Sequence, residues 1–101
     1  MVWSPELQEL RDRLLDTLLE QCREEVGSTR PVGPETDPCP HLGICDEDLD
    51  DLQIAAAAKV GLRPPYPGEP LIIPWHGPER DTTIADLAVW LAVNGRPLNT
   101  G

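Results

Sequence analysis

The 101-residue sequence contains no phenylalanine, and its aromatic residues are limited to three tryptophans and one tyrosine. Because aromatic side chains dominate many protein cores, the core of this chain has to be built from leucine, isoleucine, valine and alanine. A chain of this length buries a modest fraction of its surface, so a metal or a partner would help its stability. We therefore expect a single small domain that spans residues 1–101.

The sequence also lacks the short motifs that mark common catalytic sites. It has no glycine-rich phosphate-binding loop and no serine-nucleophile motif, and Lys59 is its only lysine. Cys39 and His41 are close enough in sequence to form a thiolate–imidazole pair, but nothing around them suggests an oxyanion site. We therefore expect a protein that is not an enzyme.

Long apolar runs are absent as well. No stretch approaches the roughly 20 apolar residues that a membrane-spanning helix needs, and the first residues lead directly into a charged segment rather than a signal peptide. Three cysteines, an odd number, do not make a disulfide framework. We expect an intracellular, cytoplasmic protein without membrane contact, where thiols stay reduced and Cys/His clusters more often bind metal.

Basic residues are scarce, with eight Lys and Arg against eighteen Asp and Glu and a net charge of −10. Residues 1–26 carry seven acids and three bases, and residues 46–62 carry five acids and one base. Nucleic-acid binding needs a basic patch, so we expect no direct binding to nucleic acid. Two acidic helical surfaces are compatible with a basic protein partner or with mimicry of nucleic-acid charge, and also with simple solvated faces.

The clearest periodic segment predicts a helix over about residues 5–26. Ser4 is a suitable N-cap, Pro5 takes the first helical position, and Gly27 provides the C-terminal stop. Apolar side chains recur at three- and four-residue steps: Leu7, Leu10, Leu14, Leu15, Leu18, Leu19, Cys22 and Val26. The stripe is wide, so either both later helices pack on it or part of it forms a homodimer or partner surface.

Two shorter helices are predicted further along the chain, over about residues 46–60 and about residues 84–94. Asp46 is an N-cap candidate for the first of them, and Thr83 begins a capping-box-like start for the second. The second is apolar on nearly all sides, which is typical of a helix at the centre of a core. We expect it to lie across the other two helices with Trp90 as its largest anchor.

Proline-rich connectors join these helices. Residues 27–45 contain four prolines and few apolar side chains, so we expect no regular element there. Residues 61–82 favour polyproline II in their first half, followed by one short extended strand near Leu71–Ile73. The sequence therefore predicts an all-α fold, a three-helix domain with long proline-rich connectors.

A cluster of metal-binding residue types closes the first connector. Cys39, His41 and Cys45 lie within seven residues, in a spacing that offers zinc three of the ligand types it uses. A closed structural zinc site needs a fourth ligand, which either Cys22 or His76 would supply. The alternatives are that Cys22 packs as a small hydrophobe in the leucine stripe and that His41 is a surface residue.

Two short segments resemble the halves of the Rieske iron–sulfur motif: C-P-H-L-G at residues 39–43 and P-W-H-G at residues 74–77. The second half of that motif requires a cysteine directly before its proline, and this chain has Ile73 there. The gap between the two halves is also far longer than the family uses. We therefore expect no [2Fe–2S] centre.

These features together predict a non-catalytic, acidic protein-binding module, an adaptor or inhibitor of a protein partner, stapled by structural zinc if the cluster binds metal. Two alternatives stay open. One is an acidic mimic of nucleic acid, and the other is a small metal or redox protein that works through Cys39, His41 and Cys45.

Overall fold

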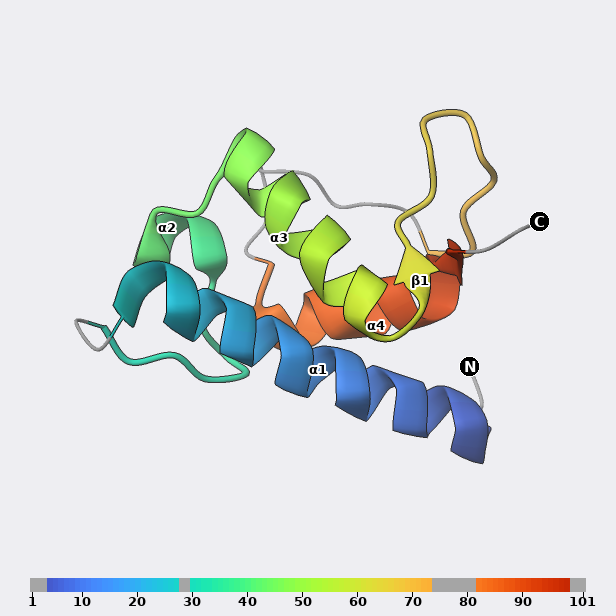
Figure 1. The fold of residues 1–101 in the computed structure, drawn as a ribbon, viewed down its shortest axis with the longest axis horizontal. Helices are drawn as coiled ribbons and strands as arrows, with labels where there is room; N and C mark the ends of the chain where they lie inside the picture. The colour runs from blue at the N-terminus through green and yellow to red at the C-terminus, as the bar shows by residue number, and fades with distance from the viewer. Residues whose placement is uncertain (1–3, 28–29, 74–81, 99–101) are drawn as a thin grey trace.

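Four helices and one small sheet make up the described parts of the chain. The computed structural model describes residues 4–27, 30–73 and 82–98. In chain order the elements are α1 (Pro5–Val26), α2 (Pro38–Leu42), α3 (Asp46–Lys59), β1 (Leu62–Arg63), α4 (Ile84–Asn94) and β2 (Arg96–Pro97) (Figure 1). The predicted all-α class is confirmed, and the three predicted helices correspond to α1, α3 and α4.

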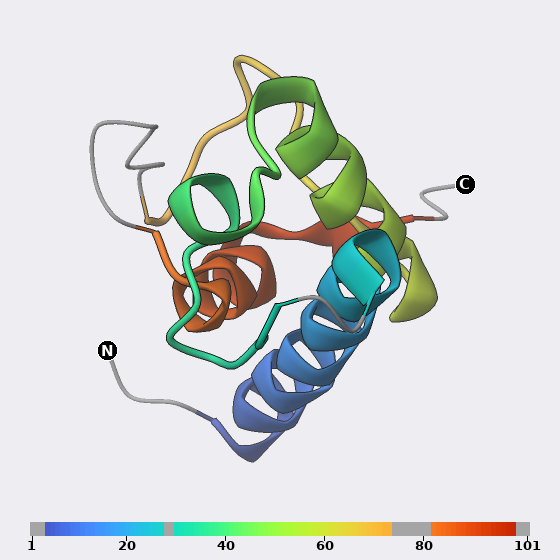
Figure 2. The ribbon, with the colours of Figure 1, turned by 90° about the vertical axis from the view of Figure 1, so that its left-hand side faces the viewer.

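Helix α1 forms the surface on which the other long helices pack. The Ser4 hydroxyl accepts a hydrogen bond from the Leu7 N–H at 3.1 Å, as expected for an N-cap. α3 and α4 both contact α1, and they cover neighbouring sides of it (Figure 2). Leu14 and Leu18 in the stripe are fully buried, so the wide apolar stripe serves both later helices, which was one of the two predicted alternatives.

The capping box expected at the start of α4 is present, and the first connector adds to it. The Asp86 N–H donates to the Thr83 hydroxyl, and the Thr83 N–H donates to the Asp86 carboxylate, each at 3.1 Å. The next helix donors also bond to the connector: the Ile84 N–H donates to the Thr36 carbonyl at 2.9 Å, and the Ala85 N–H donates to the Pro34 carbonyl at 3.0 Å. The connector is therefore fixed where it passes the N-terminus of α4.

The prediction that residues 27–45 contain no regular element is wrong, because α2 lies there. Pro38 occupies the first helical position, where no N–H partner is required. Gly43 ends the helix with a φ of +73°, a left-handed conformation that favours glycine. Five residues between these two signals are too few to show a helical period, so sequence periodicity could not reveal the helix.

The predicted strand near Leu71–Ile73 is also wrong. The strands are β1 and β2, which pair antiparallel with Leu62 opposite Pro97. Side chains rather than a neighbouring strand bind the backbone of the predicted strand. The Asn94 side chain accepts from the Ile72 N–H at 2.7 Å, and the Trp90 indole N–H donates to the Ile73 carbonyl at 3.0 Å. Trp90 is only partly buried, because its ring reaches this edge of the core.

A tight turn stands where polyproline II was predicted in the second connector. The Glu69 N–H bonds back to the Tyr66 carbonyl at 3.0 Å, and Gly68 has a φ of +92°, which matches a type II turn with proline before glycine. Arg63 pairs with the Glu69 carboxylate at 2.8 Å, and its guanidinium lies 3.9 Å from the centre of the Tyr66 ring. Arg96 also lies 3.7 Å from the Glu69 carboxylate and donates to the Pro70 carbonyl at 2.9 Å, so two arginines fix the loop at its base.

We expect the ion pair of Arg63 with Glu69 to make the stability of the folded chain depend on pH in the acid range. The hydrogen bond from Arg63 and the bond from the Tyr66 N–H lower the pKa of Glu69 from its ordinary value of 4.5 to about 2. A carboxylate whose pKa is lowered by folding stabilises the folded state at any pH above its ordinary pKa. This stabilisation is lost as the pH falls towards about 2. The variant Glu69→Gln should therefore unfold at a lower temperature than the wild type at pH 7, with the difference disappearing in acid. Thermal unfolding by circular dichroism across this pH range measures it, and a difference that does not change with pH would contradict the assignment.

Candidate functional site

The cysteine cluster forms a corner between two helices, closed by a disulfide. Cys39 lies in α2 and Cys45 is the N-cap residue of α3, and their sulfur atoms are bonded to each other. Both residues are partly buried. The bond closes a ring of residues 39–45 at the point where the chain turns from α2 into α3, and we refer to this ring as the corner.

Backbone hydrogen bonds and burial shape the α2 side of the corner independently of the disulfide. The Gly43 N–H donates to the Cys39 carbonyl, and the Ile44 N–H donates to the Pro38 carbonyl, both at 3.0 Å. Leu42 and Ile44 are 6% and 3% exposed, so the ring points two apolar side chains into the core. The sulfur atoms therefore close a turn that is already fixed at its α2 end.

His41 belongs to the corner, but its ring is engaged locally. Its Nδ1 atom accepts a hydrogen bond from the Asp37 N–H at 2.9 Å, so the neutral ring carries its proton on Nε2. A metal bound at Nε2 would require that proton to move to Nδ1, which would break the bond to Asp37. The Arg30 guanidinium donates to the His41 carbonyl at 3.0 Å, which further fixes the backbone here.

The structure brings together two of the proposed zinc ligands, Cys39 and Cys45, and joins them as a disulfide. Cys22 is fully buried in the core cluster, and this burial raises the pKa of its thiol to about 11. His76 lies outside the described residues. Within the described ranges no three Cys, His, Asp or Glu side chains are grouped to hold a metal. Zinc binding by this pair requires a reduced disulfide, and structural zinc stays a prediction.

An acidic groove lies between α1 and α3, beside the corner. Its lining residues are Gln21, Glu25, Ile44, Asp48, Asp51, Leu52 and Ala55. The carboxylate side chains belong to exposed residues, whereas Ile44 and Leu52 are buried and provide an apolar floor. None of the three carboxylates makes an ion pair with another residue that the structure describes. The groove thus combines negative charge with an apolar surface.

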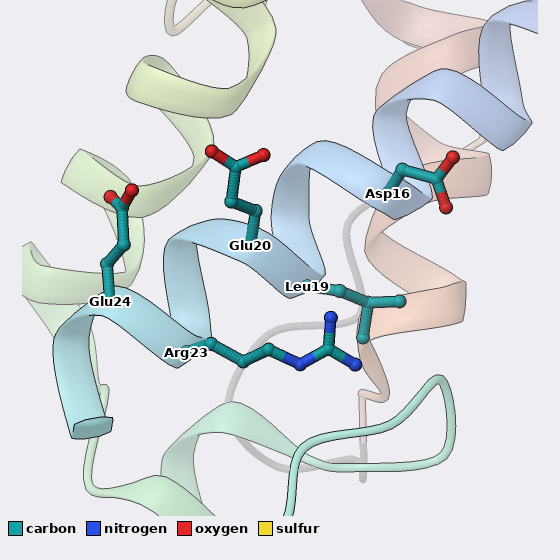
Figure 3. Close-up of a pocket in the computed structure, with 5 residues that line it drawn as sticks. All are labelled: Asp16, Leu19, Glu20, Arg23 and Glu24. Atoms are coloured by element: carbon teal, nitrogen blue, oxygen red, sulfur yellow. The ribbon is translucent and has the colours of Figure 1, made fainter. Parts of the chain in front are cut away.

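A second hollow, also lined mainly by acidic residues, lies on α1. It is lined by Asp16, Leu19, Glu20, Arg23 and Glu24 (Figure 3). The Glu20 and Glu24 carboxylates project from one side of the helix, and the Arg23 side chain extends from another. Arg23 donates to the Val32 carbonyl at 3.2 Å, and Glu20 lies 3.5 Å from the Lys59 ammonium group. One basic residue from α3 therefore meets the acidic side of α1.

Sequence reasoning identified both acidic helices but not the groove. Helical spacing places Gln21 and Glu25 on one face of α1, and Asp48, Asp51 and Ala55 on one face of α3. Which of these faces meet depends on how the two helices pack, and periodicity within one helix does not determine that. The one sequence feature that pointed to the groove was the spacing of its residues, which recur three or four positions apart along each helix.

Comparison of the chain with protein-family models, with curated proteins and with solved structures finds no match. None of the helices in the described ranges combines the length and the apolar character that crossing a membrane requires. The site therefore has to be interpreted from its own geometry.

We expect the disulfide to stabilise the folded chain by about 2 kcal/mol, because closing a seven-residue ring removes that much entropy from the unfolded state. The double variant Cys39→Ser/Cys45→Ser should lose this amount in urea unfolding at equilibrium. Reduction of the wild type should have the same effect, and reductant should leave the double variant unchanged. A variant as stable as the oxidised wild type would show that the ring contributes nothing.

Proposed function

We propose that the protein is a non-catalytic, acidic protein-binding module, an adaptor or inhibitor, whose acidic groove receives a basic segment of a protein partner. The observation that carries the proposal is the set of three carboxylates, on Glu25, Asp48 and Asp51, around an apolar floor, none of which forms an ion pair within the described part of the chain. They come from two helices that the core holds against each other, so the charges are placed before the partner arrives.

The composition of the groove favours lysine and arginine side chains. Both carry a positive end group on an aliphatic stem, and such stems lie along apolar surfaces while the charge stays in water. Ile44, Leu52 and Ala55 provide such a surface beneath the carboxylates. The net charge of −10 would additionally attract a basic partner over a distance of about a Debye length and speed its association.

The same charge supports the absence of direct binding to nucleic acid, since phosphate groups would be repelled. We propose that the module works in the cytoplasm, as the sequence predicts. α3 and α4 cover the centre of the leucine stripe of α1. A homodimer through α1 would therefore use the partly buried residues of the stripe, such as Leu10 and Leu15.

Neutralising the groove should weaken binding of a lysine-rich probe peptide about tenfold, because each exposed ion pair contributes about 0.5 kcal/mol. The groove variant carries Glu25→Gln, Asp48→Asn and Asp51→Asn. Its matched control changes the same number of charges at the far end of α1, with Glu6→Gln, Glu9→Gln and Asp12→Asn. Titration calorimetry should show the same dissociation constant for the wild type and the control, a larger one for the groove variant, and weaker binding of the wild type at higher salt.

Capture of basic proteins by the immobilised chain extends this test to natural partners. Retention that falls with salt and is lost in the groove variant supports the proposal, and competition by duplex DNA would identify the partner as a nucleic-acid-binding protein. Equal capture by the wild type and the groove variant would contradict a role for the groove.

A small metal or redox protein is the second candidate, and the pairing of Cys39 with Cys45 is the observation that favours it. If the reduced pair binds zinc, native mass spectrometry of reduced wild type from a zinc-replete preparation should show one bound metal. The double variant Cys39→Ser/Cys45→Ser should carry none. If the reduced wild type carries no metal, the protein is not a zinc protein that binds through this pair. That result would not bear on the redox chemistry of the disulfide.

A further inference from the structure

The disulfide lies directly beside the acidic groove. Ile44, which belongs to the ring, contributes to the groove floor, and Asp48, three residues beyond Cys45, contributes to its rim. The first turn of α3 joins the two, since the Asp48 N–H donates to the Cys45 carbonyl at 3.0 Å. The position of a rim carboxylate is therefore tied to the backbone of a disulfide-bonded cysteine.

The residue between them is held in an unusual conformation. Asp46, the first residue of α3, has a φ of +51°, and it is the one residue other than glycine with a positive φ in the described part of the chain. Residues other than glycine rarely adopt a positive φ, although aspartate adopts it more readily than most. Such a conformation persists when its surroundings impose it, and here Cys45 is bonded to α2 on one side while α3 begins on the other.

The two ends of the ring would respond differently to loss of the S–S bond. The α2 end keeps its hydrogen bonds from Gly43 and Ile44 and its buried side chains. The α3 end has backbone bonds from Asp48 and Leu49 to the Cys45 carbonyl, but these lie within α3 and move with it, and the Cys45 side chain makes no capping hydrogen bond. Without the bond, Asp46 can return to the right-handed region, and the first turn of α3 then shifts relative to Ile44.

We propose that Cys39–Cys45 is a reversible redox switch: reduction releases the first turn of α3 and thereby loosens the rim of the acidic groove. The effect on a partner rests on the proposed function, whereas the release of the helix does not. In the cytoplasmic location proposed above, a disulfide is usually transient and redox-sensing rather than structural, and neither Cys39 nor Cys45 is a fully buried residue.

The step is a thiol–disulfide exchange with a dithiol reductant. One thiolate of the reductant attacks a sulfur of the pair, a mixed disulfide forms as the Cys39–Cys45 bond breaks, and the departing thiolate takes a proton. The second thiol of the reductant then attacks the mixed disulfide. The reductant ends as a disulfide, and the protein ends as two thiols that have gained two electrons and two protons.

Amide hydrogen exchange of the full chain, oxidised and then reduced with dithiothreitol, tests the switch without any partner. Reduction should speed exchange at Asp48 and Leu49, whose N–H groups bond to the Cys45 carbonyl, while Gly43 and Ile44 stay protected. The lysine-rich probe peptide should bind about two- to tenfold more weakly to the reduced form, because a loosened rim has to be ordered on binding. Unchanged exchange in the first turn of α3 would overturn the proposal.

Two substitutions at Asp46 make the test sharper. Asp46→Gly accepts a positive φ without strain and should make the disulfide harder to reduce, whereas Asp46→Ala should make it easier. Equilibration with dithiothreitol measures both, and equal reduction of the two variants would also overturn the proposal. If the peptide binds neither form while exchange still responds to reduction, the proposed function fails and the switch stands.

Discussion

The packing of two helices on the leucine stripe of α1 is the constraint on which the other features depend. Leu14 and Leu18 are fully buried, and burying a leucine side chain contributes about 1.5–3 kcal/mol. Since the chain has no phenylalanine, these leucines replace the large aromatic anchors of other small cores. The acidic residues of α1 flank the stripe, so packing α3 against the stripe brings their charges to the edge of the contact, and the groove is a consequence of the core.

The connectors are ordered by polar contacts to the helix ends rather than by a core of their own. Asn94, the last residue of α4, is 3% exposed, and its side chain bonds to the backbone N–H and C=O of Ile73 and to the N–H of Ile72. At the other end of α4, the carbonyl groups of Pro34 and Thr36 accept from the first helix N–H groups. Ordering a residue costs about 1–2 kcal/mol of backbone entropy, so long proline-rich segments remain in place only where such bonds recur.

Local signals predicted the elements whose causes are local. α1 and α4 follow from caps and periodicity, and α1 begins and ends at its expected residues, Pro5 and Val26. α3 follows from periodicity, but its N-cap residue is Cys45 and not Asp46 as predicted. Among the features that sequence reasoning missed, α2 is local but too short to show a helical period, and the others depend on tertiary proximity. β1 and β2 are two residues each and pair across more than thirty residues, and the odd number of cysteines argued against a disulfide although one pair is joined and Cys22 is buried. The acidic helices were predictable, but the meeting of Glu25 with Asp48 and Asp51 was not.

Charge and packing act against each other at the site. The carboxylates that would attract a basic partner repel one another, and the nearest compensation between the two helices is one exposed ion pair, Glu20 with Lys59 at 3.5 Å, which contributes little. Burial of Leu52 and Ala56 holds the middle of α3 against the core. The first turn of α3 carries Asp46, Glu47 and Asp48, and its apolar residue, Leu49, is only partly buried against the core, so the bond at Cys45 adds a restraint where the packing is weaker. A change at the corner therefore acts on the part of the groove that the core controls least.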